Sequence, residues 1–317
     1  MVKVRSPASA TVINAIATGF GSAFGIKLYV TADVNIVSFD AKEDIECECI
    51  SLDDPDMDTS LMERCIKLTY EKLCEYDCFN LKNIKLEVKT KSDIPPGSGL
   101  SSSSAASNSV VYGTIIDLLG ACNLTMDDVN ITDDDIVNIA IEASLDVGVS
   151  ITGAYDDASA SFYGGWKICD NYERKILKDY SIKYSKVLIY IPDKSSYTAQ
   201  CDVENMKVLA PLVEIAFSHA IDENIEKALT LNGLLYANAL NFDTNIVLDA
   251  LKAGAKAAGL SGTGSAYSIL VDDLDIEEIK SALSKYPGLL IETEPDNEGS
   301  VVIRWGLFWI NKKLKNY

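Results

Sequence analysis

The segment from residue 95 to residue 105 constrains the fold of this chain most, because two glycines and four consecutive serines stand there between a predicted strand and a predicted helix. Residues 84–88 alternate apolar and polar side chains, which is typical of a strand, and residues 102–119 carry the apolar pattern of a helix. The segment consists of Pro95, Pro96, Gly97, Ser98, Gly99, Leu100, Ser101, Ser102, Ser103, Ser104 and Ala105. The chain must therefore fold so that a glycine-rich loop leads directly into the N-terminus of a long helix.

A loop of this kind can bind an anion, most simply a phosphate group. Gly97 and Gly99 allow positive φ angles and a close approach of the backbone to a ligand. The start of the helix offers unpaired backbone N–H groups and the positive end of the helix dipole. The hydroxyls of residues 101–104 can bond phosphate oxygens or Mg²⁺. The alternative is a loop that only caps the helix, although packing alone gives little reason for four serines. The P-loop pattern G-x-x-x-x-G-K-[ST] does not occur.

Composition predicts a globular protein of roughly two domains, since the chain has 317 residues, of which 48% are hydrophobic and 24% are charged. We predict a boundary near residue 170, where polar residues interrupt the pattern, and hence domains at 1–170 and 171–317. The net charge of −19 argues against a nucleic-acid partner and against anionic membranes. No uninterrupted apolar run approaches the roughly 18 residues of a membrane span.

The histidine and cysteine content narrows the chemistry further. His219 is the only histidine, so a site with several histidines is excluded, and we interpret His219 as a helix residue. An acid–base catalyst is then expected to be a carboxylate or a lysine. The eight cysteines form no CxxC pair, and we interpret the N-terminus as mature protein. Free thiols in a reducing cytoplasm are therefore expected.

The order of predicted elements indicates the α+β class, with helices packed on antiparallel sheets, because there is no regular βαβ alternation. Strands are predicted at 27–39, 84–88, 161–167, 186–191, 266–271 and 301–310. Helices are predicted at 60–76, 102–119, 136–145, 203–220, 224–231, 244–258 and 276–284, with Pro211 breaking or kinking the fourth.

Two further glycine-rich segments are candidate ligand loops. Residues 260–266 lie between a predicted helix and a predicted strand, and they form either a plain turn or a second binding loop. Residues 19–25 have the spacing G-x-G-x-x-x-G, which misses the dinucleotide-binding fingerprint, so we reject that site.

Asp156 and Asp157 are adjacent carboxylates in an otherwise small and apolar stretch. Near bound phosphates, one of them could accept a proton from an attacking hydroxyl or hold a metal ion. The alternative is that the pair caps a helix starting at Ala158. The acidic residues between 127 and 135 are instead interpreted as charges at a helix N-terminus.

The sequence P-P-G-S-G-L-S-S-S-S-A at 95–105 resembles the second motif of the GHMP kinase superfamily, which includes galactokinase, homoserine kinase and mevalonate kinase. Residues 259–266 are similar to the third glycine-rich loop of that superfamily. Within it, residues 8–26 and 150–161 resemble the archaeal-type shikimate kinases. The resemblance covers the chain from residue 7 to about residue 270.

This resemblance implies a two-domain GHMP kinase fold whose N-terminal domain has ribosomal protein S5 domain 2-like topology. It also implies phosphorylation of the 3-hydroxyl of shikimate by ATP with Mg²⁺, giving shikimate 3-phosphate and ADP. Two alternatives stay open: another small-molecule kinase of the superfamily, such as a homoserine or mevalonate kinase, and a non-catalytic metabolite-binding protein. The sequence does not give the oligomeric state, so both a monomer and a dimer stay open.

The resemblance also suggests roles for individual residues. Residues 95–105 would form the nucleotide loop, in which Ser103 takes the place of a serine that ligates Mg²⁺ and Ser101 stands where the family usually has glycine. Asp157 lies seven residues before Gly164, as the catalytic aspartate of the family does, and is preferred to Asp156 as the base. The metal-binding glutamate corresponds to either Glu142 or Asp146.

The substrate side is assigned more loosely. Thr11, Asn14, Gly262 and Gly264 are the candidates to contact the substrate. The carboxylate of shikimate calls for a cation, and the basic residues nearest the recognised segments are Arg5, Lys27 and Lys194.

Overall fold

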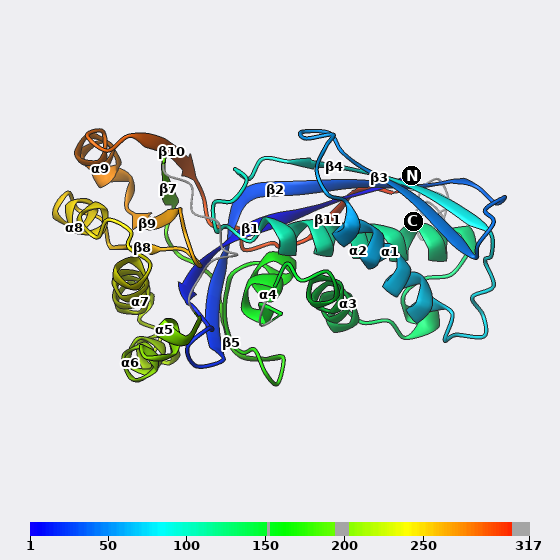
Figure 1. Ribbon diagram of the computed structural model, residues 1–317, viewed down its shortest axis with the longest axis horizontal. Helices are drawn as coiled ribbons and strands as arrows, with labels where there is room; N and C mark the ends of the chain where they lie inside the picture. The colour runs from blue at the N-terminus through cyan, green and yellow to red at the C-terminus, as the bar shows by residue number, and fades with distance from the viewer. Residues whose placement is uncertain (151–152, 194–202, 306–317) are drawn as a thin grey trace, which may run out of the picture.

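The computed structural model describes residues 1–150, 153–193 and 203–305, which form two sheets covered by helices (Figure 1). In the larger sheet the strands follow the order β11-β1-β2-β4-β3, while β5 pairs with β2 and β6 pairs with β5. Its strands are β1 (Val2–Ile13), β2 (Phe20–Ser38), β3 (Ile45–Ser51), β4 (Ile84–Ser92), β5 (Trp166–Asp170), β6 (Lys175–Tyr180) and β11 (Val301–Arg304). All of these pairs are antiparallel except β3 with β4, which run parallel.

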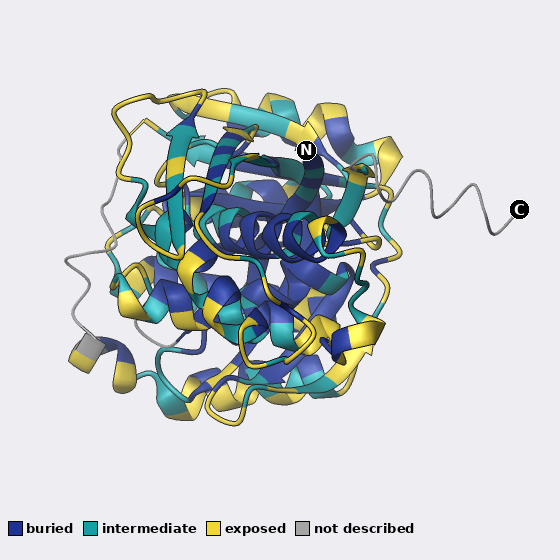
Figure 2. Cartoon of the chain, turned by 90° about the vertical axis from the view of Figure 1, so that its right-hand side faces the viewer, coloured by how far each residue is buried: buried dark blue, intermediate teal, exposed yellow. Residues whose placement is uncertain are grey.

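Four helices cover one face of the larger sheet: α1 (Ser60–Leu73), α2 (Ser102–Ala121), α3 (Asp133–Asp146) and α4 (Tyr155–Tyr163). Helix α2 is central, because it packs on β1 and β2 and also contacts α1, α3 and α4. Most of its side chains are buried, and Figure 2 shows buried residues gathered in the interior of the molecule beneath exposed outer turns. Gly113 lets α2 approach β2 closely, since a Cβ there would lie 2.7 Å from the Val34 side chain.

The smaller sheet has the order β10-β7-β9-β8. Its strands are β7 (Lys186–Pro192), β8 (Ala257–Leu260), β9 (Tyr267–Val271) and β10 (Gly288–Thr293). The accompanying helices are α5 (Val203–Lys207), α6 (Ala210–Ile221), α7 (Ile225–Ala239), α8 (Asn245–Lys252) and α9 (Ile276–Leu283). Figure 1 shows this group at one end of the larger sheet, beside the curved part of β1 and β2.

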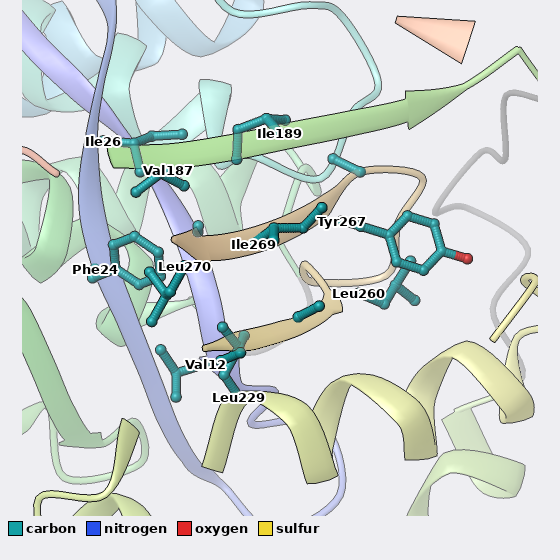
Figure 3. Packing of buried hydrophobic residues seen from close by; sticks show 14 of the residues in the cluster. Val12, Phe24, Ile26, Val187, Ile189, Leu229, Leu260, Tyr267, Ile269 and Leu270 are labelled. Carbon is teal, nitrogen blue, oxygen red and sulfur yellow. The ribbon is translucent and has the colours of Figure 1, made fainter. Parts of the chain in front are cut away.

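A continuous apolar core joins the two sheets (Figure 3). Val12, Phe24 and Ile26 of β1 and β2 pack in one buried cluster with Leu260 and Leu270 of the smaller sheet. Burying apolar side chains of this size stabilises the fold by about 1.5–3 kcal/mol each. The join between the sheets is therefore a fixed part of the fold.

The predicted α+β class is confirmed, and Pro211 does interrupt the helical region, because α5 ends before it and α6 begins with it at its N-terminus. Two predicted elements are wrong. Residues 161–163 belong to α4, and the strand starts only at Trp166, since the glycines at 164 and 165 end the helix. The helix predicted over 244–258 stops at Lys252, and its last residues form β8.

The glycine-rich loop at 261–266 consequently connects two strands, and the prediction that it follows a helix is wrong. The domain boundary at residue 170 stays a prediction. Strands β6 and β11 lie beyond that residue and pair within the larger sheet. Within the described residues, no helix is both long enough and apolar enough to cross a membrane.

Candidate active site

The loop at 95–101, which we call the serine loop, leads from β4 into α2, as the sequence predicts. Gly97, Gly99 and Ser101 all have positive φ angles, of 64°, 75° and 56°. Glycine adopts this conformation at little cost, whereas Ser101 holds it as the residue that precedes the first turn of α2. The loop therefore turns sharply and presents the N-terminal N–H groups of a 20-residue helix.

The serine loop lies against the loop between β8 and β9. The backbone N–H of Ala266 donates to the carbonyl of Ser98 at 2.8 Å. The hydroxyl of Ser261 donates to the carbonyl of Gly99 at 2.9 Å and accepts from the N–H of Thr11 at 3.0 Å. Ser261 thus connects the serine loop, the β8–β9 loop and strand β1 through one buried hydroxyl.

A cavity of about 260 Å³ opens where these segments meet. On one side, the wall is formed by β1 with the residues after it and by the β8–β9 loop. The serine loop, the first turn of α2, the end of α3 and the start of α4 form the rest of the wall. The wall residues predicted from the sequence are Thr11, Asn14, Gly97, Ser98, Gly99, Leu100, Ser101, Ser102, Ser103, Ser104, Asp156, Asp157 and Gly262.

The charge in this wall is negative, because within the described part of the chain Asp156 and Asp157 are its only ionisable residues. No lysine or arginine of that part lines the cavity. Among the described residues, the groups that favour an anion here are backbone N–H groups and the N-terminal ends of α2 and α4.

Asp156 and Asp157 both stand in the first turn of α4 but differ in surroundings. Asp156 is only 3% exposed, and its Oδ1 accepts from Nδ2 of Asn171 at 2.7 Å. Burial and the adjacent charge of Asp157 raise the pKa of Asp156 to about 7. Asp157 is half-buried and accepts from the Ser9 hydroxyl at 3.0 Å.

Burial raises the pKa of Asp157 too, while hydrogen bonds from Ser101 and Ser9 lower it. A carboxylate that is partly open to the cavity and has a raised pKa is placed as a general base requires. The helix predicted to start at Ala158 begins three residues earlier, so the pair lies within its first turn.

The predicted substrate contacts fall into two groups. Thr11 stands in the cavity wall, and its buried hydroxyl has no hydrogen-bond partner within the described residues. Asn14 instead uses its amide within the protein, because Nδ2 donates to the carbonyl of Gly262 at 3.0 Å and Oδ1 accepts from the N–H of Ile16 at 2.9 Å. A Cβ at Gly264 would lie 2.5 Å from the Phe242 ring, which indicates a packing role.

Most of the residues predicted to bind a metal ion or the carboxylate of the substrate lie outside the cavity wall. Ser103 lines the cavity, but Glu142 pairs with Arg174 at 2.7 Å and Asp146 pairs with Arg64 at 2.7 Å, and neither acid is among the described wall residues. The predicted cations are likewise away from the cavity wall. Arg5 pairs with Glu298 and Lys27 with Glu294, whereas Lys194 lies outside the described residues.

Residues 60–165 match the GHMP kinases N terminal domain, and residues 218–288 match the GHMP kinases C terminal domain. The shikimate kinase of Methanothermobacter thermautotrophicus is 48% identical over 303 residues, which cover 95% of this chain and 97% of that protein. The chain belongs to the archaeal-type shikimate kinase family of the GHMP kinases.

Other comparisons agree with this membership. The shikimate kinase of Methanobrevibacter smithii is 46% identical, over 93% of this chain and 97% of that protein. The crystal structure of Methanococcus jannaschii mevalonate kinase superposes with a TM-score of 0.68, covering 92% of this chain and 98% of that one. Its sequence identity is only 18%, so it shows the shared fold alone. The predicted two-domain GHMP kinase fold is thereby confirmed.

The sequence analysis did not identify Ser9, Asn171 and Ser261. These are three buried polar residues whose hydrogen bonds connect the segments that form the cavity. Each acts on a partner far along the chain or across a turn: Ser9 and Asp157 are 148 positions apart, and Thr11 and Ser261 are 250 apart. A lone serine or asparagine carries no local pattern. Their burial, visible only in the fold, is the signal that identifies them.

Replacing Ser261 with alanine is expected to lower the free energy of unfolding by about 1–3 kcal/mol, because the carbonyl of Gly99 and the N–H of Thr11 would both lose their partner in a buried site. Urea unfolding measures this loss. Ser218→Ala is the matched control, since its hydroxyl bonds a backbone carbonyl on an exposed helix surface and should cost less than about 0.5 kcal/mol. Equal stability of the two variants would contradict the bridging role of Ser261.

Proposed function

We propose that this protein transfers the terminal phosphoryl group of ATP to the 3-hydroxyl of shikimate, giving shikimate 3-phosphate and ADP. The observation that carries the proposal is the position of Asp157, whose carboxylate shares one cavity with the N-terminus of α2. The proposal is supported by relatives that are named shikimate kinases and match nearly the whole chain. The described cysteines are all free thiols, which supports a cytoplasmic location as part of this proposal.

Nucleotide binding would rest on the serine loop. The wall that the structure describes holds no cation, so the backbone N–H groups from Gly97 to Ser104 and the dipole of α2 would bind the ATP phosphates. Residues 95–105 would thus make up the nucleotide loop. Since the loop is fixed by hydrogen bonds before the ligand arrives, little ordering would be needed on binding.

Asp157 would act as the general base. Its carboxylate would accept the proton of the 3-hydroxyl while that oxygen bonds to the γ-phosphorus, and the bond from the γ-phosphorus to the β,γ-bridging oxygen would break to release ADP. The Ser9 and Ser101 hydroxyls hold this carboxylate in place. Thr11 would bond a substrate hydroxyl with its free side-chain oxygen, while Asn14, Gly262 and Gly264 would shape the pocket on that side.

A magnesium ion fits the oxygen-rich wall of the cavity, because Mg²⁺ is commonly held by one or two protein oxygens together with substrate phosphates. When bound, the ion would neutralise charge on the phosphates. We propose the Ser103 hydroxyl as one ligand. Glu142 stays the proposed carboxylate, although it would have to exchange its ion pair with Arg174 to serve in this way.

An assay of ADP release with shikimate, homoserine and mevalonate side by side tests the proposal. We expect turnover with shikimate and at least about 100-fold lower kcat/KM with the other two, because a polar pocket rejects substrates that leave its groups unpaired. Mass spectrometry of the product would show one added phosphoryl group. ATP binding without turnover of any substrate would indicate a non-catalytic binding protein and contradict the proposal.

A further inference from the structure

Asp156 stands in the cavity wall with almost no exposed surface, and Asn171 forms two hydrogen bonds with it. The Oδ1 of Asp156 accepts from Nδ2 of Asn171 at 2.7 Å, and the backbone N–H of Asp156 donates to Oδ1 of Asn171 at 3.2 Å. Asn171 is itself 4% exposed, and its N–H donates to the carbonyl of Gly19 at 2.9 Å. The first turn of α4 is thus bonded to the end of β5, which is bonded to the start of β2.

Strand β2 also packs against the Asp156 carboxyl group. A Cβ placed on Gly21 would lie 2.3 Å from Oδ2 of Asp156, which is far inside contact distance. Gly21 has an ordinary backbone conformation, so this close approach is what requires glycine there. The Asp156 carboxyl group therefore has one conformation that fits its surroundings.

Burying the Asp156 carboxyl group lowers the stability of the fold, so stability by itself does not explain why an aspartate stands at this position. Asp156 forms no ion pair with a cation of the described chain, and the ionisable groups that face it are Asp157 on its own helix and Cys169 on β5. A buried carboxyl group with a like charge beside it destabilises a fold unless its hydrogen bonds compensate. A purely structural contact between α4 and β2 could be made by apolar side chains at lower cost.

The neighbouring Asp157 has few contacts of its own. Serine hydroxyls at Ser9 and Ser101 touch its carboxylate, while its backbone follows wherever the first turn of α4 is placed. We propose that Asp156 and Asn171 are a positioning pair, which fixes the first turn of α4 so that the Asp157 carboxylate points at the serine loop. The role of Asp156 as a second catalytic group is replaced by this one, and the inference rests on the proposed function of Asp157 as base.

Kinetics of Asn171→Ala test the pair, because this substitution removes both hydrogen bonds to Asp156. We expect kcat to fall by about 10–100-fold, the cost of misplacing a reacting group, while KM for ATP and for shikimate changes by less than about threefold. Asp156→Ala should lose a similar factor, and the double variant should lose no more than the larger single loss, since the two residues act as one unit. Asp156→Asn should recover most of kcat, because its side-chain oxygen can still accept from Asn171.

Ser22→Ala is the matched control for simple loss of stability. Its buried hydroxyl accepts from Trp166 and donates to the carbonyl of Lys167, so it also links β2 to β5, but it does not line the cavity. This variant should melt earlier without a loss of kcat. Full kcat in Asn171→Ala, multiplicative losses in the double variant, or an inactive Asp156→Asn would each overturn the positioning role.

A crystal structure of Asn171→Ala separates this inference from the proposed function. If the wild-type protein does not phosphorylate shikimate, the proposed function fails, yet the positioning role can still be judged from geometry. We expect the distance from Ser9 Oγ to Asp157 Oδ1, now 3.0 Å, to exceed hydrogen-bond range in the variant. An unchanged Asp157 would refute the pair even if the enzyme proves to be active.

Discussion

Asp157→Asn is expected to lower kcat by about 10²–10⁴-fold, the usual contribution of a general base. An amide cannot accept the proton of the substrate hydroxyl, whereas it occupies nearly the same volume and can still accept the Ser9 hydrogen bond. The affinity for ATP should change by less than about threefold, because in the proposed function the phosphates bind to the serine loop and not to Asp157. Coupled ADP release gives kcat, and calorimetric titration of the nucleotide gives the affinity.

Asp134→Asn provides the matched control for this change. Asp134 also stands in the first turn of a helix, in α3, and its carboxylate accepts from the Tyr163 hydroxyl outside the cavity. The same loss of one negative charge, at a position outside the cavity wall, should leave kcat within about threefold of wild type. A normal kcat in Asp157→Asn would remove Asp157 from the mechanism, and an equal loss in both variants would assign the effect to overall charge.

The serine loop and the aspartate pair are predictable from sequence because their signals are local. A strand, two glycines, four serines and a helix follow one another without interruption, so the loop must sit at the helix N-terminus wherever the fold places it. The adjacent Asp156 and Asp157 stand out for the same reason. What sequence alone leaves open is which of the two carboxylates is more exposed, since successive residues of a helix point about 100° apart.

The remaining parts of the site depend on contacts between distant segments. Thr11 reaches Ser261 across 250 positions, and no periodicity in either segment announces that contact. Strand β8 is not predicted from the sequence for a related reason. Its four residues are all small or apolar, so they continue the apolar pattern of the helix before it. Pairing with β9 makes it a strand, so tertiary contacts override the local preference.

In the proposed function the conformation of the serine loop is important for nucleotide binding, because the described cavity wall holds no lysine or arginine. In a chain with a net charge of −19, an anionic nucleotide is repelled at long range and attracted only where N–H groups converge. Such N–H groups act only if the backbone is held in one conformation. The hydrogen bonds from Ser261 and Ala266 to the serine loop supply that rigidity.

Gly99→Ala is accordingly expected to damage both stability and nucleotide binding. A Cβ at Gly99 would lie 2.6 Å from the carbonyl oxygen of Gly264 and 2.8 Å from that of Ser261, and both obstacles are backbone atoms. The positive φ of 75° adds conformational strain of about 1–2 kcal/mol. Together with overpacking of about 1–3 kcal/mol, the free energy of unfolding should fall by about 2–5 kcal/mol. The affinity for ATP should fall at least about 100-fold, since the two glycine-rich loops would be forced apart.

Gly97→Ala separates strain from overpacking in the same loop. Gly97 also has a positive φ, of 64°, but among the described residues no atom would lie within 4 Å of a Cβ there. The free energy of unfolding of Gly97→Ala should therefore fall only by the conformational strain, about 1–2 kcal/mol. Urea unfolding should accordingly show that Gly99→Ala is clearly less stable than Gly97→Ala. Equal losses of stability would mean that the contact between the serine loop and the β8–β9 loop is not tight. A loss of ATP affinity in Gly97→Ala without further loss of stability would instead place the phosphates beside Gly97, in the space that the methyl group fills.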